Sequence, residues 1–226
     1  MLKSIFIRKA IFLFIISLII TVRPSKSQEV LQWYLPRDAQ NRQSWDAVKL
    51  TAIGEYGLVR KARPTVPSHL HTGIDFKRPG TNYVDEPVYP AAIGKVISLR
   101  SDGPFAQIII EHQVDTDTKL WTVYEHVAGI CVQYGQYVYP ENPIARYMTK
   151  EELDKYGWQF DHFHFEVMKI PPRQAKPDQL KPFRYFDTYC LVCYTDKDLE
   201  KHYYHPQEFL LTQWRQTSAA QPGAGE

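Results

Sequence analysis

Cysteine is scarce in this chain of 226 residues, which contains three: Cys131, Cys190 and Cys193. So few cysteines exclude a small fold built on a disulfide framework. Cys190 and Cys193 precede His202 and His205 in a C-x2-C-x8-H-x2-H pattern, whose central gap is shorter than the zinc-finger gap of about twelve residues. A disulfide, simple burial and a second metal site all stay open. We favour the first two, because oxidation competes for thiols outside the cytosol.

Long hydrophobic runs are missing too, apart from one near the N-terminus. That run, Ile11–Val22, follows three basic residues and precedes the small residues Ser25 and Ser27. It is well short of the ~20 apolar residues that span a bilayer, whereas this order of basic, apolar and small residues is typical of a signal peptide. We expect residues 1–27 to be cleaved before Gln28. The mature protein would then be exported to the periplasm or the extracellular cell envelope, without stable membrane insertion.

A large charge of one sign is also absent. The whole chain has a formal net charge of +2, but its first 27 residues hold five basic residues and no acidic one. Removing them leaves 22 of the 27 Lys and Arg residues against 25 Asp and Glu, a net charge of −3. A nucleic-acid partner thereby loses its main electrostatic support, and we expect none. The short basic run of Arg60, Lys61 and Arg63 predicts a solvated surface.

Aromatic residues, by contrast, are plentiful at 14%, and 16 prolines outnumber 11 glycines. Hydrophobic residues at 44% and charged residues at 23% are ordinary for globular proteins and exclude a disordered chain. Short runs rich in β-branched and aromatic residues alternate with Gly, Pro, Asp and Asn, which predicts a mainly β fold of short strands joined by turns. The predicted strands are 88–92, 95–99, 107–112, 120–126, 136–139, 144–148 and 163–169.

One helix interrupts these strands. Thr149 with Glu152 three residues later forms a capping box, and Gly157 is suited to end the helix. A second short helix is expected from Pro206 to about Trp214, in a Pro-rich extension. The chain therefore divides into a signal peptide (1–27), a lead-in (28–66), the main domain (67–170), a Pro-rich crossing with a C-terminal extension (171–217) and a disordered tail (218–226).

Three segments carry residues suited to metal chemistry. In the predicted strand Asp161–Val167, alternation places His162, His164 and Glu166 on one face and the apolar residues on the other. His71 and Asp75, four residues apart in extended backbone, also share a face and are donors that suit Zn²⁺. Such an H-x3-D pair alone is a weak signal.

The third segment ends in a histidine. Alternation places Tyr124 and His126 on one face of the strand 120–126, with Glu125 on the other. Of the remaining histidines, His69 is expected to be solvated and His112 structural. Cys131, between Ile130 and Val132, is expected to be a buried strand residue.

Five motifs follow one another along the chain: H-x-G-x-D at 71–75, V-Y-P-A-A-x-G-K-V at 88–96, Y-x-H at 124–126, G-Q-x-V at 135–138 and H-x-H-F-E at 162–166. Together they resemble the motifs of the lysostaphin/LytM-type zinc metallo-endopeptidases, which cut peptides of bacterial cell-wall peptidoglycan. The resemblance covers roughly residues 50–170. It implies a compact antiparallel β-sheet domain of the duplicated hybrid motif type, with a cleft floored by the sheet and walled by loops.

Carried over by position, the resemblance implies that His71, Asp75 and His164 bind one Zn²⁺ per chain and that His126 and His162 are catalytic. Three protein ligands leave a position for water, whose pKa zinc can lower to about 7. The chain has no H-E-x-x-H motif to supply a glutamate base. The two histidines are therefore expected to accept the proton of the water and to steady the oxyanion.

Glu166 is expected to orient His164 from behind. The segment Tyr156–Phe160 stands where family members usually have a Gly- and Ser-rich loop, so it is expected to narrow a cleft wall. Peptidoglycan is the expected partner, with a protein regulator in the envelope as a further one.

Other functions stay open on the sequence. One is a catalytically silent protein that binds the wall or regulates a hydrolase, although all five site positions are filled. Another is an exported endopeptidase that acts on proteins. A peptidase that uses Cys131 as nucleophile is the least favoured, because no nearby helix start would activate that thiol.

Overall fold

The computed structural model describes residues 31–83 and 85–220. The predicted signal peptide, residues 1–27, and residues 221–226 of the predicted tail lie outside the described residues. Within the described residues, no helix has the length and apolar character needed to cross a bilayer.

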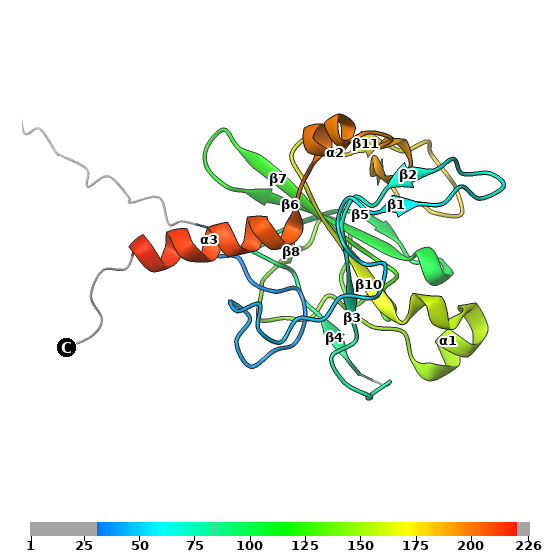
Figure 1. The fold of residues 1–226 in the computed structure, drawn as a ribbon, viewed down its shortest axis with the longest axis horizontal. Coiled ribbons are helices and arrows are strands. Elements are labelled where there is room, and N and C mark those ends of the chain that lie inside the picture. The colour runs from blue at the N-terminus through cyan, green and yellow to red at the C-terminus, as the bar shows by residue number, and fades with distance from the viewer. Residues whose placement is uncertain (1–30, 84, 221–226) are drawn as a thin grey trace, which may run out of the picture.

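An antiparallel sheet of seven strands forms the body of the molecule (Figure 1). Its strand order is β13-β10-β7-β6-β5-β8, and β3 also pairs with β10. This arrangement confirms the predicted mainly β fold. The strands are β3 (Ile74–Lys77), β5 (Gly94–Arg100), β6 (Gln107–Gln113), β7 (Lys119–Glu125), β8 (Tyr137–Val138), β10 (His162–Met168) and β13 (Tyr203–Tyr204).

Three two-stranded ribbons surround this sheet. They pair β1 (Val59–Arg60) with β2 (His69–Leu70), β4 (Pro87–Val88) with β9 (Ala145–Arg146), and β11 (Arg173–Gln174) with β12 (Phe186–Asp187). The strands predicted over 88–92 and 144–148 are thus much shorter than expected. Both runs contain apolar residues that are buried without forming a longer ladder.

Both faces of the central sheet are buried. On one face, Ile108 and Ile110 of β6 pack with Phe165 of β10; on the other, Ile109 packs with Met168. Burial on both sides explains why β6 reads as a continuous apolar run rather than an alternating one. The predicted inward face of β10, including Phe163 and Val167, is confirmed, with these residues fully buried.

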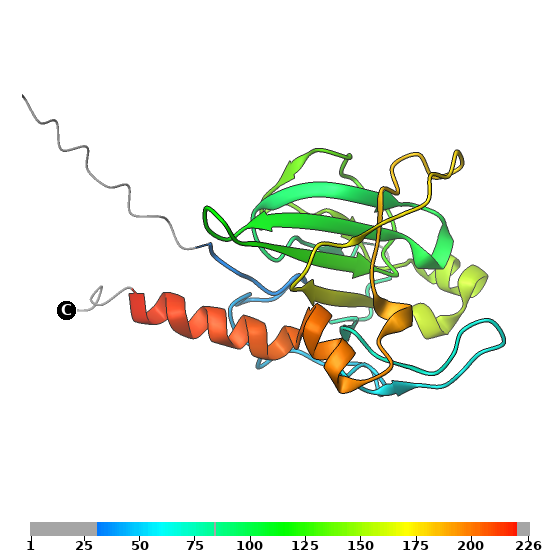
Figure 2. The same cartoon turned by 90° about the horizontal axis from the view of Figure 1, so that it is seen from above.

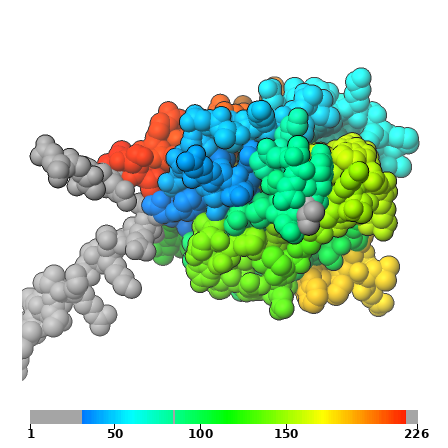
Figure 3. Space-filling model, turned by 90° about the horizontal axis from the view of Figure 1, so that it is seen from below, coloured from blue at the N-terminus to red at the C-terminus, as the bar shows by residue number. Residues whose placement is uncertain are grey.

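Residues before and after the main domain cover these two faces. Trp33 of the lead-in packs edge-on against Phe209 of α3 (Pro206–Ala220), with ring centroids 4.7 Å apart. Figure 2 shows α3 running beneath the sheet, and Figure 3 shows the lead-in lying against α3. Leu199 of α2 (Asp196–His202) and Tyr203 belong to the core of the opposite face. The C-terminal extension therefore completes both cores.

The predicted capping box is confirmed at α1 (Lys150–Tyr156). Thr149 accepts a hydrogen bond from the backbone of Glu152, whose side chain accepts one from the backbone of Thr149. Gly157 ends the helix with φ of 114°, a conformation that favours glycine. Three short 3-10 turns also occur: η1 (Gly103–Phe105), η2 (Trp158–Phe160) and η3 (Cys190–Val192).

Several local expectations were wrong. Cys131 is exposed and lies outside any strand, because its neighbours Ile130 and Val132 turn inward instead. His69 is buried rather than solvated, since β2 pairs with β1. α3 continues to Ala220, beyond Trp214, so residues 218–220 of the predicted disordered tail are helical.

The cysteines are free thiols in the described structure. Sγ of Cys193 lies 3.9 Å from Nδ1 of His202. The four residues of the C-x2-C-x8-H-x2-H pattern nevertheless form no group able to hold a metal among the residues described. Nδ1 of His202 is instead 2.5 Å from the carbonyl of Asp198, which places the ring in a helix-capping role. Burial raises the pKa of the Cys193 thiol to about 12.

Candidate metal centre

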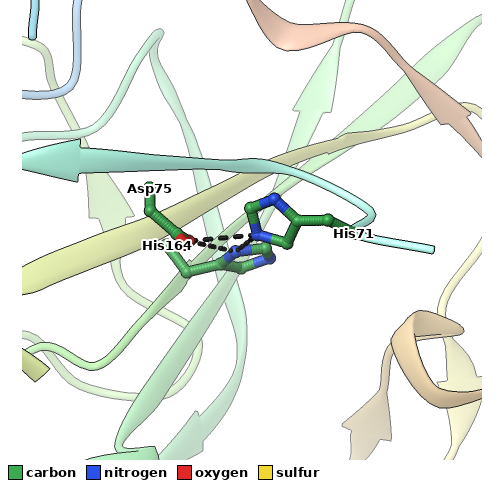
Figure 4. Close-up of side chains that lie close together, drawn as sticks. All are labelled: His71, Asp75 and His164. Carbon is green, nitrogen blue, oxygen red and sulfur yellow. Dashed lines mark hydrogen bonds and ion pairs between the residues drawn. The ribbon is translucent and has the colours of Figure 1, made fainter. Parts of the chain in front are cut away.

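Two distant parts of the chain bring three donor atoms together at one point (Figure 4). His71 lies between β2 and β3, Asp75 lies on β3 and His164 lies on β10. The pairing of β3 with β10 sets Asp75 directly opposite His164. Nε2 of His71 is 2.9 Å from Nδ1 of His164, and each nitrogen is 3.0 Å from Oδ1 of Asp75. All three side chains are buried.

Gly73 makes this convergence possible. A Cβ at this position would stand 2.2 Å from the carbonyl oxygen of Phe165 and 2.8 Å from the ring of His164. Because no side chain can occupy that space, the glycine of the H-x-G-x-D motif lets the turn approach β10 closely.

The lead-in segment positions His71 from behind. The carbonyl of Glu55 lies 2.8 Å from Nδ1 of His71, and the backbone N–H of His71 donates to the carbonyl of Leu58. Nδ1 therefore carries the proton of a neutral His71 ring, and the lone pair of Nε2 faces Asp75 and His164. The segment 54–58, treated from the sequence as a lead-in, thus belongs to the site.

Glu166 holds the far side of His164. Its Oε1 lies 3.0 Å from Nε2 of His164 and accepts a hydrogen bond of 2.5 Å from the hydroxyl of Thr72. Its Oε2 is buried with no hydrogen-bond partner among the described residues. Glu166 thereby orients the ring so that Nδ1 points at the other two donors, the arrangement typical of metal-binding histidines.

The electrostatics of the centre favour a cation. Burial works against a charged His164, but hydrogen bonds to Asp75 and Glu166 outweigh it and raise the pKa of His164 to about 10. Burial likewise opposes the charged form of Asp75, yet the bonds from His164 and His71 hold the pKa of Asp75 well below its usual range. Without a metal, a proton on His164 and the guanidinium of Arg60 provide the positive charge beside the two buried carboxylates.

The donor set fits zinc. Two imidazole nitrogens and one carboxylate oxygen are the donor types that Zn²⁺ takes, and three protein ligands are the number found in catalytic zinc sites. These three residues form the one group able to hold a metal ion among the described residues. A divalent cation here would displace the shared proton of His164.

Arg60 contacts the centre, which the sequence did not indicate. Its guanidinium lies 2.7 Å from Oδ2 of Asp75, the oxygen that faces away from the two histidines. The basic run was expected to be solvated, and only the pairing of β1 with β2 brings Arg60 to this position. A salt bridge of this kind fixes which carboxylate oxygen faces the metal site.

Two more histidines stand beside the three donors. The rings of His126 and His162 meet edge to face with centroids 5.1 Å apart, and Nε2 of His162 is 3.8 Å from Oδ1 of Asp75. Nδ1 of His126 lies 2.6 Å from the carbonyl of Pro104. Because that contact places the proton on Nδ1, the Nε2 of His126 keeps a free lone pair.

His126 reaches this position through an unusual backbone. Tyr124 faces the core against Phe165, so regular alternation would send His126 to that same face. Its φ of 63° instead makes it the one non-glycine residue with positive φ among those described, and turns the ring toward His162. The expectation that Tyr124 and His126 share a face was therefore wrong. Such backbones cluster at functional sites.

Aromatic rings enclose His126 on its other sides. Phe160 of η2 lies 5.0 Å from its ring and Phe105 of η1 lies 5.8 Å from it. Burial lowers the pKa of His126, and burial also lowers the pKa of His162, to about 3. Phe160, at the end of the 156–160 segment, thus lies beside the histidine pair.

Comparison with known proteins gives a family for this region. A sequence profile described as peptidase family M23 matches residues 69–179. No curated protein matches.

Solved structures are similar over part of the chain. A zinc-containing peptidase from Vibrio cholerae is 26% identical, with 61% of this chain and 37% of that chain covered and a TM-score of 0.40. The catalytic domain of the prophage-encoded M23 protein EnpA from Enterococcus faecalis is 20% identical, with coverages of 69% and 94% and a TM-score of 0.39. A chain of the SpoIIIAH–SpoIIQ complex is 20% identical, with coverages of 61% and 92% and a TM-score of 0.43. The TM-scores lie below 0.5, so the assignment rests on the sequence match.

Proposed function

Residues 69–179 belong to peptidase family M23, and from this premise we propose that the protein is an exported zinc-dependent endopeptidase that hydrolyses peptide bonds in the stem peptide or cross-link of peptidoglycan. The observation that carries the proposal is the convergence of His71, Asp75 and His164 within 3.0 Å, with two further histidines alongside.

Each residue has a distinct part in this proposal. His71, Asp75 and His164 hold the zinc, which supplies Lewis-acid activation of the attacking water and of the scissile carbonyl. His126 and His162 take up the proton of the water and deliver it to the nitrogen of the leaving amine as the C–N bond breaks. An N–H of the same pair steadies the oxyanion. Glu166 and Arg60 hold the ligands in place.

The anchoring of His126 supports its role. Pro104 fixes the proton on Nδ1, so Nε2 is the atom that can accept a proton. Its burial among Phe105 and Phe160 favours the neutral ring. A neutral imidazole with one free lone pair is the form that a general base needs.

Digestion of intact sacculi tests the proposal. We expect mature protein loaded with zinc to release peptides whose masses identify the bond, and we expect His126→Ala to keep its zinc and lose this release. Glu141→Gln, at an exposed position, provides the control. Zinc-loaded protein that leaves sacculi intact would instead indicate a wall-binding or regulatory protein, and cleavage of proteins alone would indicate a different substrate.

A further inference from the structure

A cavity of about 530 Å³ lies apart from the metal centre, and none of its lining residues is a proposed ligand or catalytic residue. It lies between the end of β5, the loop around Tyr134 and the loop around Phe183. This volume is in the range of pockets that hold small molecules, about 300–1,000 Å³. A concave site of this size suits a ring-bearing ligand better than the flat face of a protein partner.

Exposed aromatic rings form one wall. Tyr134 and Phe183 are 48% and 52% exposed, and their rings are nearly parallel, at 17°, with centroids 6.4 Å apart. Tyr185 supports Tyr134 from 4.6 Å. Large rings left open to solvent in a cavity offer apolar faces for a ligand to cover.

The backbone holds this wall in place. The N–H of Leu99 on β5 donates to the carbonyl of Phe183, and Ser98 bonds both the carbonyl and the N–H of Phe186. The Pro-rich crossing is therefore fastened to the central sheet at this point, and the rings are preorganised rather than carried on a free loop.

Both cations that line the cavity are already paired with a carboxylate. Nε of Arg100 lies 2.8 Å from Oδ1 of Asp102, and Nζ of Lys181 lies 3.2 Å from Oδ2 of the same carboxylate. An anionic ligand would have to compete with Asp102 for both cations. The amide of Gln133 and the hydroxyl of Tyr134 remain to pair with neutral polar groups. A purely apolar ligand would bury these groups without hydrogen-bond partners, which is unfavourable.

Neighbouring residues connect the lining of the cavity to the candidate active site. Arg100 lies 5.6 Å over the ring of Phe105, which in turn contacts His126. Asp102 also immediately precedes η1, the turn whose Pro104 carbonyl anchors His126. The segment 99–105 therefore supplies part of the cavity lining and, at Pro104, the carbonyl that holds His126.

We propose that this cavity binds neutral N-acetylated sugar rings of the glycan strand and so places the attached peptide at the metal centre. This inference rests on the proposed action on peptidoglycan. A sugar ring has an apolar C–H face that covers an aromatic ring and a rim of hydroxyl and acetamido groups that pair with Gln133 and Tyr134. It thus matches the aromatic wall, the neutral polar groups and the volume together.

Binding of a tetramer of N-acetylglucosamine to the full mature chain, measured by calorimetry, tests this inference. We expect saturable binding that weakens about tenfold or more in Tyr134→Ala and in Phe183→Ala. Tyr139→Ala, which removes an equally exposed tyrosine outside the cavity, should bind as the unaltered protein does. His71→Ala should also bind the sugar, since the cavity does not include the metal centre.

The two proposals fail separately. Sugar binding without cleavage of sacculi would contradict the proposed function and leave the sugar site standing. Cleavage of sacculi by a protein that shows no saturable sugar binding, or whose Tyr134→Ala and Phe183→Ala variants bind the tetramer unchanged, would overturn the sugar site alone. If the site is correct, Tyr134→Ala raises KM for a peptide attached to sugar and leaves KM for the free peptide unchanged.

Discussion

His164 is held between two carboxylates, and this position explains why the centre is suited to a cation. Asp75 meets one ring nitrogen and Glu166 meets the other, each at 3.0 Å. Glu166 is also fixed by the hydroxyl of Thr72. Thr72 directly follows the proposed ligand His71, and Glu166 contacts the proposed ligand His164. The H-x-G-x-D and H-x-H-F-E motifs are therefore linked behind the metal site as well as at it.

Replacing Glu166 by Gln tests this support. The substitution keeps the shape of the side chain but removes the charge that orients His164, so zinc affinity should fall about 10- to 100-fold. Competition with a chromophoric chelator measures the change. Glu141→Gln, an exposed substitution of the same kind, should leave affinity unchanged. Unaltered affinity in Glu166→Gln would show that the carboxylate does not position the ligand.

The left-handed backbone of His126 predicts an inverted order of stability for two substitutions. A Cβ in this conformation costs roughly 1–2 kcal/mol, whereas glycine adopts it freely. We therefore expect His126→Gly to be more stable than His126→Ala by about 1 kcal/mol in chemical denaturation. At the neighbouring Glu125, which lies in strand β7, alanine should be more stable than glycine. The same order at both positions would contradict the strained backbone.

Single residues of the site were predictable to different degrees. Strand periodicity alone placed His162, His164 and Glu166 in one row, and β10 confirms this. The turn of His126 at φ 63° breaks periodicity, so only the family resemblance pointed to it. Arg60 was missed because its contact with Asp75 depends on pairing between β1 and β2, which no local pattern specifies.

At the scale of elements, His112 joins three strands. His112 lies on β6. Its Nδ1 is 2.8 Å from the carbonyl of Ile93, next to β5, and its Nε2 is 2.7 Å from the hydroxyl of Thr122 on β7. The ring is fully buried, and burial lowers the pKa of His112 from its ordinary 6.5 to about 4. The folded protein thus binds this proton less well than the unfolded chain does.

Stability should therefore fall as the pH drops from 6.5 toward 4. The stabilisation is present above pH 6.5 and amounts to about 3 kcal/mol for the shift of this one group. His112→Gln lacks this titration. Between pH 7 and pH 4.5 its free energy of unfolding should therefore fall by about 2 kcal/mol less than that of the unaltered protein. Denaturation of both proteins in chelator excludes loss of metal as the cause. Parallel pH profiles would contradict the prediction.

Whether an element could be predicted depended on how local its determinants are. The capping box at Thr149 and the stop at Gly157 lie within eight residues, and α1 begins and ends where they indicate. The ribbon β4–β9 joins segments far apart in sequence, so neither its length nor its pairing could be foreseen. α3 continues past Trp214 although nothing in its polar sequence required the extra residues.

At the scale of the whole molecule, the two ends of the described chain meet. The indole N–H of Trp214 donates to the carbonyl of Trp33 at 2.9 Å, across 181 residues of sequence. Both tryptophans are buried in the core that includes Phe163 and Phe165 of β10. The segments outside the family match therefore stabilise the strand that carries two of the site histidines.

Trp214→Ala should lower the free energy of unfolding by about 3–5 kcal/mol, because it leaves a cavity in this core and removes the indole hydrogen bond to the carbonyl of Trp33. Trp158→Ala is the matched comparison, since that ring is 48% exposed, and it should cost less than about 1 kcal/mol. Denaturant titration measures both. Equal costs would show that α3 is not part of the core.

The zinc content of the purified mature protein tests the central claim most directly. We expect about one zinc per chain, its loss in His71→Ala and in Asp75→Asn, and its retention in His126→Ala, each in a protein that still unfolds cooperatively. A mature protein that takes up no zinc, or a His71→Ala variant that keeps its full complement, would contradict the assignment of His71, Asp75 and His164 as a metal centre.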